Sequence, residues 1–87
     1  MPQVFIPSQL TAYTDGVTRV EALGATVGAV LDDLDRRYPG LKFRLVDEQD
    51  RVRRHMRLFI GQDETRSVSA PLTESDELLI FGALSGG

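Results

Sequence analysis

The carboxyl-terminal residues carry the clearest suggestion of chemistry in this sequence. They are Leu84, Ser85, Gly86 and Gly87, and they directly follow an apolar segment. Because glycine makes up about 7% of ordinary proteins, a chain ends in two glycines by chance about once in 200. A frayed terminus is the ordinary explanation. The alternative is a functional terminus. Two residues without Cβ can enter a narrow cleft of a partner protein, and the terminal carboxylate that they carry is ionised at neutral pH.

The remaining side chains form no recognisable catalytic or metal-binding pattern. The sequence has no cysteine, which excludes disulfides, thiolate metal sites and cysteine nucleophiles. His55 is the single histidine, and no second histidine or cysteine is available to share a metal with it. Ser8 and Ser85 have no histidine and acid arrangement that would activate them. We therefore predict no catalytic residue, no metal and no enzymatic activity.

A basic cluster surrounds His55. It consists of Arg51, Arg53, Arg54 and Arg57. Residues 32–57 carry eight bases and six acids, whereas residues 58–87 carry one base and five acids, so the charge is polarised along the chain. Such a cluster can steer a partner or bind a phosphorylated ligand, or it can be a solvated loop with local ion pairs.

Three aspartates, Asp32, Asp33 and Asp35, lie close together in the sequence. In a helix they would lie on different faces, so we expect a solvated surface and no cation site. Asp32 and Arg36 have the i, i+4 spacing of an ion pair.

Length and composition indicate one folded domain over residues 1–87. The 87 residues are 41% hydrophobic and 26% charged, which is ordinary globular usage. A net charge of -3 argues against a general affinity for nucleic acid. No signal peptide is evident, and the longest apolar run, residues 78–84, is far shorter than a membrane span. We expect a cytoplasmic protein with no nucleic-acid or membrane partner.

The amino-terminal residues have the pattern of a hairpin. Val4 and Ile6 alternate with other residues up to Pro7, which predicts a first strand. Asp15-Gly16 is typical of a turn, and a second strand is predicted within residues 17–22. The connection is longer than two residues.

A helix is predicted from residue 26 to residue 38. Its apolar residues recur at the spacing of one helix face; they are Val27, Val30, Leu31, Leu34 and Tyr38. Thr26 is the expected N-cap, and Pro39-Gly40 is expected to end the helix.

The second half of the chain has the pattern of strands. They are predicted at residues 43–46, 56–60 and 78–81, with a tight turn at 61–64. The predicted fold class is α+β, with a mixed sheet of four to five strands covered by one main helix. When the first and last strands are parallel neighbours, this is the β-grasp (ubiquitin-like) arrangement. Residues 82–87 are expected to be a mobile Gly-Gly tail.

Nearly the whole chain resembles the ubiquitin-like sulfur carrier family, also called ThiS/MoaD-like. The similar segments are residues 5–10, 24–38, 56–64, 75–80 and 84–87. The family includes the thiamin thiazole sulfur carrier, the small subunit of molybdopterin synthase and the cysteine-biosynthesis carrier of actinobacteria, and the last is the most similar type. The chain departs from the pattern at Gly82-Ala83, where the family often has proline, and at Gly61-Gln62, where it often has Asn-Gly.

The resemblance implies a carrier whose reactive group is the carboxylate of Gly87. In the family, an E1-like enzyme adenylates this carboxylate with ATP, and a sulfurtransferase or other sulfur donor converts it to a thiocarboxylate. Gly86, Ser85 and Leu84 would be the residues recognised in the tail, with Leu84 as its anchor. No cofactor would be bound by this chain, and a biosynthetic enzyme would accept the sulfur.

Strand alternation predicts a docking surface. The residues expected to face the helix are Met56, Leu58, Ile60, Leu78 and Ile80. Phe59, Leu79 and Phe81 must then point to the opposite face, where an apolar cluster is typical of an interaction site. We predict that these three residues bind the activating enzyme and the acceptor enzyme in turn. Coverage by a loop or by self-association is the alternative.

Several functions share this pattern. A ubiquitin-like modifier, conjugated to lysines through Gly87, needs the same tail, and the small subunit of molybdopterin synthase has the same fold. A β-grasp interaction module with an incidental Gly-Gly is a third class. The helix and residues 56–66 favour a carrier for amino-acid or secondary-metabolite sulfur.

Overall fold

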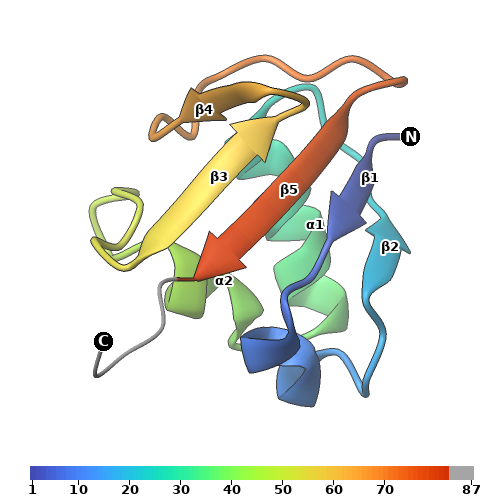
Figure 1. Ribbon diagram of the computed structural model, residues 1–87, viewed down its shortest axis with the longest axis vertical. Coiled ribbons are helices and arrows are strands. Elements are labelled where there is room, and N and C mark those ends of the chain that lie inside the picture. Colours follow the sequence, from blue (N-terminus) through green and yellow to red (C-terminus); the bar gives the residue numbers. More distant parts are fainter. Residues whose placement is uncertain (83–87) are drawn as a thin grey trace.

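A computed structural model describes residues 1–82 and shows one five-stranded sheet with helices on one face (Figure 1). The strands are β1 (Gln3–Phe5), β2 (Arg19–Glu21), β3 (Met56–Ile60), β4 (Asp63–Thr65) and β5 (Glu77–Gly82). The helices are α1 (Val27–Arg37), α2 (Leu41–Leu45) and the 3-10 helix η1 (Ser8–Tyr13).

The sheet has the predicted mixed topology. Its strand order is β2-β1-β5-β3-β4. β1 and β5 are parallel neighbours at the centre, and every other pair is antiparallel. The first and last strands of the described chain therefore lie side by side, which confirms the β-grasp arrangement.

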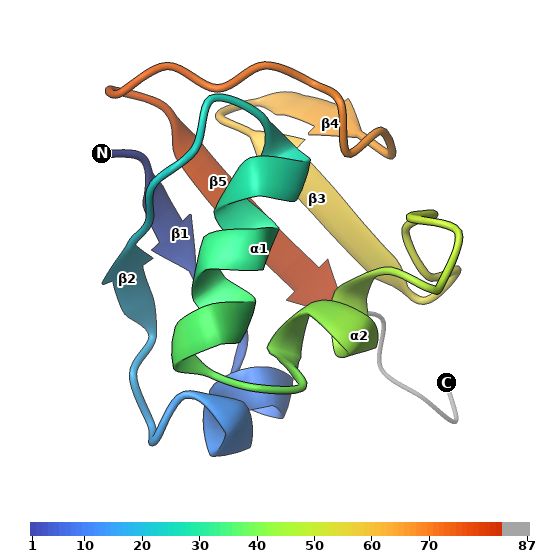
Figure 2. The same ribbon diagram turned by 180° about the vertical axis from the view of Figure 1, so that it is seen from behind.

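Helix α1 crosses the covered face of the sheet (Figure 2) and begins where the sequence predicts. The hydroxyl of Thr26 accepts a hydrogen bond of 3.1 Å from the backbone N–H of Ala29, which would otherwise have no partner in the first helical turn. Gly40 follows with a φ of 95°, a left-handed conformation that glycine adopts without strain. The chain can therefore turn sharply and start α2.

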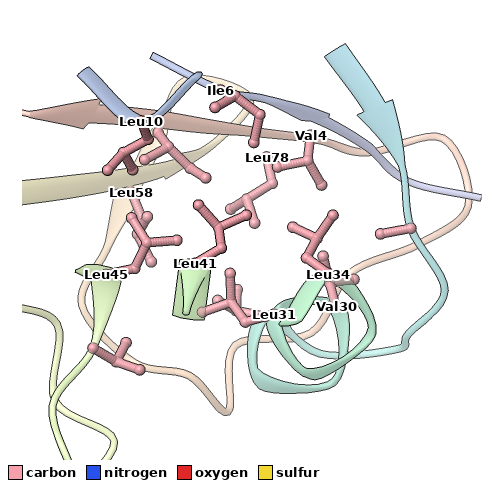
Figure 3. Packing of buried hydrophobic residues seen from close by; sticks show 14 of the residues in the cluster. Val4, Ile6, Leu10, Val30, Leu31, Leu34, Leu41, Leu45, Leu58 and Leu78 are labelled. Carbon is pink, nitrogen blue, oxygen red and sulfur yellow. The ribbon is translucent and has the colours of Figure 1, made fainter. Parts of the chain in front are cut away.

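The core lies between the sheet and the two α-helices (Figure 3). Leu58 and Leu78 of the sheet are fully buried, as are Leu31 and Leu34 of α1. Burying a side chain of this size contributes about 1.5–3 kcal/mol to folding. The five residues predicted to face the helix do so, with Ile60 partly buried at the edge of the core and the other four buried.

The strand predicted at residues 43–46 is wrong. Residues 41–45 form α2, because Leu41 and Leu45, four residues apart, both bury their side chains completely against the core. Phe43 between them is 56% exposed. Val46 alone is extended, in an isolated bridge to Val52.

Two connections also differ from the prediction. The turn after β3 is confined to Gly61-Gln62, and Asp63–Thr65 pairs with β3 as β4. The connection between β1 and β2 contains η1, whose Leu10 is buried in the core. No helix among residues 1–82 has the length and hydropathy to cross a membrane.

Candidate functional site

The face of the sheet opposite the helices carries an apolar cluster, which we call the outer face cluster: Phe5, Phe59, Leu79 and Phe81. Leu79 is directly opposite Phe5 on β1 and Phe59 on β3, so three strands contribute adjacent side chains. Phe81 is half exposed, and its ring meets that of Phe59 edge to face, with centroids 5.6 Å apart. No described helix crosses this face in Figure 1.

Charged side chains border the outer face cluster. At one edge, the guanidinium of Arg19 on β2 lies 5.0 Å from the ring centroid of Phe5. At the other edge, Arg57 on β3 lies 3.9 Å from Glu64 on β4. An apolar centre with a charged, solvent-exposed border is the composition of a protein-binding surface.

Phe5 was missed as a member of this surface. Its alternation with the buried residues Val4 and Ile6 is visible in the sequence. The β-grasp arrangement places β1 beside β5, but the sequence does not show the register that puts Phe5 next to Leu79. The register of this long-range pairing therefore decides whether Phe5 belongs to the surface.

Strand β5 ends at Gly82, the first residue of the tail predicted from the sequence. Gly82 pairs with Met56 at the start of β3, and its carbonyl accepts a hydrogen bond of 3.4 Å from the side chain of Gln9 on η1. A Cβ atom at Gly82 would lie 2.5 Å from Gln9 Oε1, so a larger residue there would require the end of the Gln9 side chain to move. The residues predicted to be recognised in the tail, Leu84, Ser85, Gly86 and Gly87, lie outside the described residues.

The basic cluster around His55 lies in a loop held by its own hydrogen bonds. Asp47 accepts hydrogen bonds from the backbone N–H groups of Arg51 and Gln49, which lower the pKa of its carboxyl group. Arg53 donates to the carbonyl of Phe43 at 2.6 Å and stacks on its ring. Local ion pairing is therefore confirmed for Arg51, whose guanidinium lies 3.4 Å from Asp47.

This loop borders an open hollow of about 550 Å³. Its lining residues are Asp47, Arg51, Val52, Arg53, Arg54, His55 and Arg66. Arg66 donates to the carbonyls of Met56, Val52 and Arg53, so part of the positive charge is committed to holding the loop. Among residues 1–82 no group of three or more metal-ligating side chains occurs.

The three aspartates of α1 all bind other groups of the fold, and the prediction that all are solvated is wrong for Asp33. Asp33 is buried, with its carboxylate bound by the N–H of Leu23 at 3.0 Å, by Arg36 at 2.7 Å and by Arg37 at 3.0 Å. The hydrogen bond from Leu23, followed by that from Arg36, lowers the pKa of Asp33. These contacts fasten α1 to the segment after β2.

The other two aspartates connect α1 to α2. Asp32 pairs with Lys42 and not with Arg36, because Arg36 is already bound to Asp33. Asp35 accepts hydrogen bonds from the backbone N–H groups of Gly40 and Lys42, which fixes the start of α2.

Known proteins share both this fold and this sequence pattern. The sulfur carrier protein CysO of Mycobacterium tuberculosis is 30% identical over 89 residues, covering 97% of this chain and 96% of the relative. A chain of the Amycolatopsis orientalis BexX/CysO complex superimposes with a TM-score of 0.93 and 34% identity, with complete coverage of both chains. SAMP1 of Haloferax volcanii matches with a TM-score of 0.76 and 26% identity, over 98% of this chain and 97% of its own. The ThiS family model matches residues 4–87, and the chain therefore belongs to the ThiS family.

Proposed function

We propose that this chain carries sulfur as a thiocarboxylate on the terminal carboxyl group of Gly87. The observation that supports this most is the family match, which extends through residue 87 and so includes the Gly-Gly end. The similar proteins from mycobacteria are sulfur carriers. In this proposal the chain is a carrier, and the catalytic groups belong to its partner enzymes.

The chemistry takes two steps. A carboxylate oxygen of Gly87 attacks the α-phosphorus of ATP on an E1-like enzyme, and pyrophosphate leaves. The sulfur of hydrosulfide then attacks the acyl carbon, the bond to AMP breaks, and loss of the S–H proton leaves a thiocarboxylate at the terminus. When the donor is a sulfurtransferase persulfide, the same attack leaves an acyl disulfide, and a thiol must then cleave its S–S bond to release the thiocarboxylate. No cofactor is held by this chain, because ATP is bound by the activating enzyme.

The outer face cluster is the proposed docking surface for these partners. Phe59, Leu79 and Phe81 offer an apolar centre on β3 and β5, and β5 ends at Gly82, five residues before Gly87 in the sequence. The complex of the Amycolatopsis orientalis relative with BexX supports stable docking of this fold on another protein. The activating enzyme and the acceptor enzyme would use the surface in succession.

The acceptor is proposed to be an enzyme that makes a sulfur-containing amino acid or secondary metabolite. The similarity to CysO proteins along almost the whole chain supports this class.

Intact-mass measurement tests the proposal. The full chain is incubated with the E1-like enzyme of its source organism, ATP and sodium sulfide. Replacement of one oxygen by sulfur at Gly87 is the expected product, and a chain lacking Gly87 should stay unmodified. A control carrier that the enzyme adenylates, with consumption of ATP, shows that the enzyme is active. An unchanged mass of the full chain under these conditions contradicts the proposal.

The second candidate function is protein modification, which the likeness to the archaeal modifier SAMP1 favours. In that case the activated carboxylate of Gly87 forms an isopeptide bond with a lysine of another protein. Conjugates of higher mass in a cell extract, which disappear when Gly87 is deleted, distinguish this function from thiocarboxylate formation.

A further inference from the structure

The basic residues of this chain are almost all arginines. Nine of the ten are arginine, and Lys42 is the single lysine. An arginine guanidinium keeps its proton in proteins and therefore supplies positive charge without an amine nucleophile. Because cysteine is also absent, Lys42 is the only side-chain amine or thiol in the sequence that an activated acyl group could modify.

Lys42 is held between two carboxylates from different parts of the fold. Its Nζ lies 2.5 Å from Asp32 Oδ1 on α1 and 3.6 Å from Asp50 Oδ1 in the loop after α2. Its side chain is 26% exposed. The hydrogen bond to Asp32, with the charge of Asp50, raises the pKa of Lys42 and so favours the ammonium form, which has no lone pair.

The backbone around Lys42 is fixed as well. The N–H of Lys42 donates to Asp35 of α1 at 3.2 Å, which holds the first turn of α2 beside α1. The N–H of Asp50 donates to the carbonyl of Asp47 at 3.0 Å, within the loop that the Asp47 side chain also stabilises. The two carboxylates and the amine are therefore positioned by ordered segments.

We propose that Asp32 and Asp50 withhold Lys42 from acylation, so that the activated carboxylate of one copy is not consumed by the lysine of another. This inference rests on the proposed function, in which Gly87 becomes an acyl-adenylate. In the reaction that is suppressed, the neutral Nζ attacks the acyl carbon, the bond to AMP breaks, and the nitrogen loses a proton to leave an isopeptide bond. Lys42 of one copy would then react poorly with the activated Gly87 of another copy, and chains linked through Lys42 would not form.

A chemical acyl donor tests this without any partner enzyme. The full chain is treated with the N-hydroxysuccinimide ester of acetic acid at neutral pH, and peptide mass spectrometry follows acetylation of Lys42. An Arg54→Lys variant supplies a reference amine in the same molecule, since Arg54 is exposed and forms no ion pair among the described residues. We expect Lys42 to react on the order of tenfold more slowly than the lysine introduced at position 54.

Releasing the amine gives the second arm of the test. The double variant Asp32→Asn and Asp50→Asn should bring the rate at Lys42 close to that at position 54. The charge-matched control variant, Asp63→Asn and Glu74→Gln, alters two exposed acids elsewhere and should leave the rate at Lys42 unchanged.

Equal rates at Lys42 and at position 54 in the folded protein would overturn the proposal. That comparison needs only the Arg54→Lys variant, so it stands even when the double asparagine variant is too unstable to measure. The acetylating reagent acts without adenylation of Gly87, so the two proposals can fail separately. Slow acetylation of Lys42 together with no thiocarboxylate on Gly87 in the intact-mass experiment would contradict the proposed function and leave the shielding of Lys42 intact.

Discussion

The two faces of the sheet are formed by neighbouring residues of the same strands, but one face is buried in the core and the other is exposed. On β3 and β5, Leu58 and Leu78 are completely buried under the helices, whereas Phe81 is 50% exposed on the opposite face. Strand alternation separates the two sets by a single residue. The inner face therefore stabilises the fold, and the outer face can be shaped for a partner at small cost to stability.

The largest effect on folding is expected on the inner face. Leu58→Ala should lower the free energy of unfolding by about 3 kcal/mol, because it removes buried methyl groups and leaves a cavity in the core between the sheet and the helices. Urea unfolding followed by circular dichroism measures this. A loss below about 1 kcal/mol would mean that the core rearranges to fill the space.

The outer face should behave in the opposite way. The double variant Phe59→Ser and Phe81→Ser should weaken binding to the activating enzyme by on the order of tenfold or more, since aromatic residues at the centre of an interface carry much of its affinity. Its free energy of unfolding should fall by only about 1 kcal/mol, through loss of the edge-to-face contact. Calorimetric titration and urea unfolding measure the two quantities.

Phe43→Ser is the matched control for this experiment. Phe43 is as exposed as Phe81 but lies on α2, away from the outer face. Its replacement should leave binding unchanged. Equal loss of binding in the control, or unfolding of the double variant, would contradict the separation of the two faces.

A smaller, pH-dependent effect is expected where α1 is fastened over the inner face. Hydrogen bonds from Leu23 and Arg36 lower the pKa of Asp33 below its ordinary value of 3.8. The contribution of Asp33 to stability is therefore fully present above pH 3.8 and is lost as the pH falls through the lower folded-state pKa. Asp33→Asn should be less stable than the wild type at neutral pH, and the difference should narrow below pH 3.8.

Urea unfolding of both proteins across this pH range checks the prediction. Other carboxyl groups titrate in both proteins alike, so the difference between them isolates Asp33. A gap that stays constant in acid would mean that the charge of Asp33 contributes nothing to stability.

The smallest effect is expected at the charged border of the outer face. Arg57 is well exposed, and its 3.9 Å pair with Glu64 is screened by water. Arg57→Ala should change the free energy of unfolding by less than about 0.5 kcal/mol. A larger loss by urea unfolding would show that this border belongs to the structural part of the sheet.

Much of this architecture follows from local patterns. Helical spacing after Thr26 predicts α1 and its cap, because the cap and the apolar face are both encoded within a few residues. Alternation in β3 and β5 predicts which side chains enter the core. The error at residues 43–46 has a local cause too: a five-residue segment is too short for its spacing to separate one helical turn from a strand.

Local sequence patterns account for the alternating strands and the capped helix, and the composition shows no cysteine and a single lysine. Packing of the whole chain brings Phe5 beside Phe59 and Leu79 on one surface, buries Asp33 and places Asp32 and Asp50 around Lys42. The two groups of features differ in the sequence separation of the residues that make them. Caps and alternation act between residues a few positions apart, whereas these contacts require segments distant in the chain to be brought together by burial of the common core.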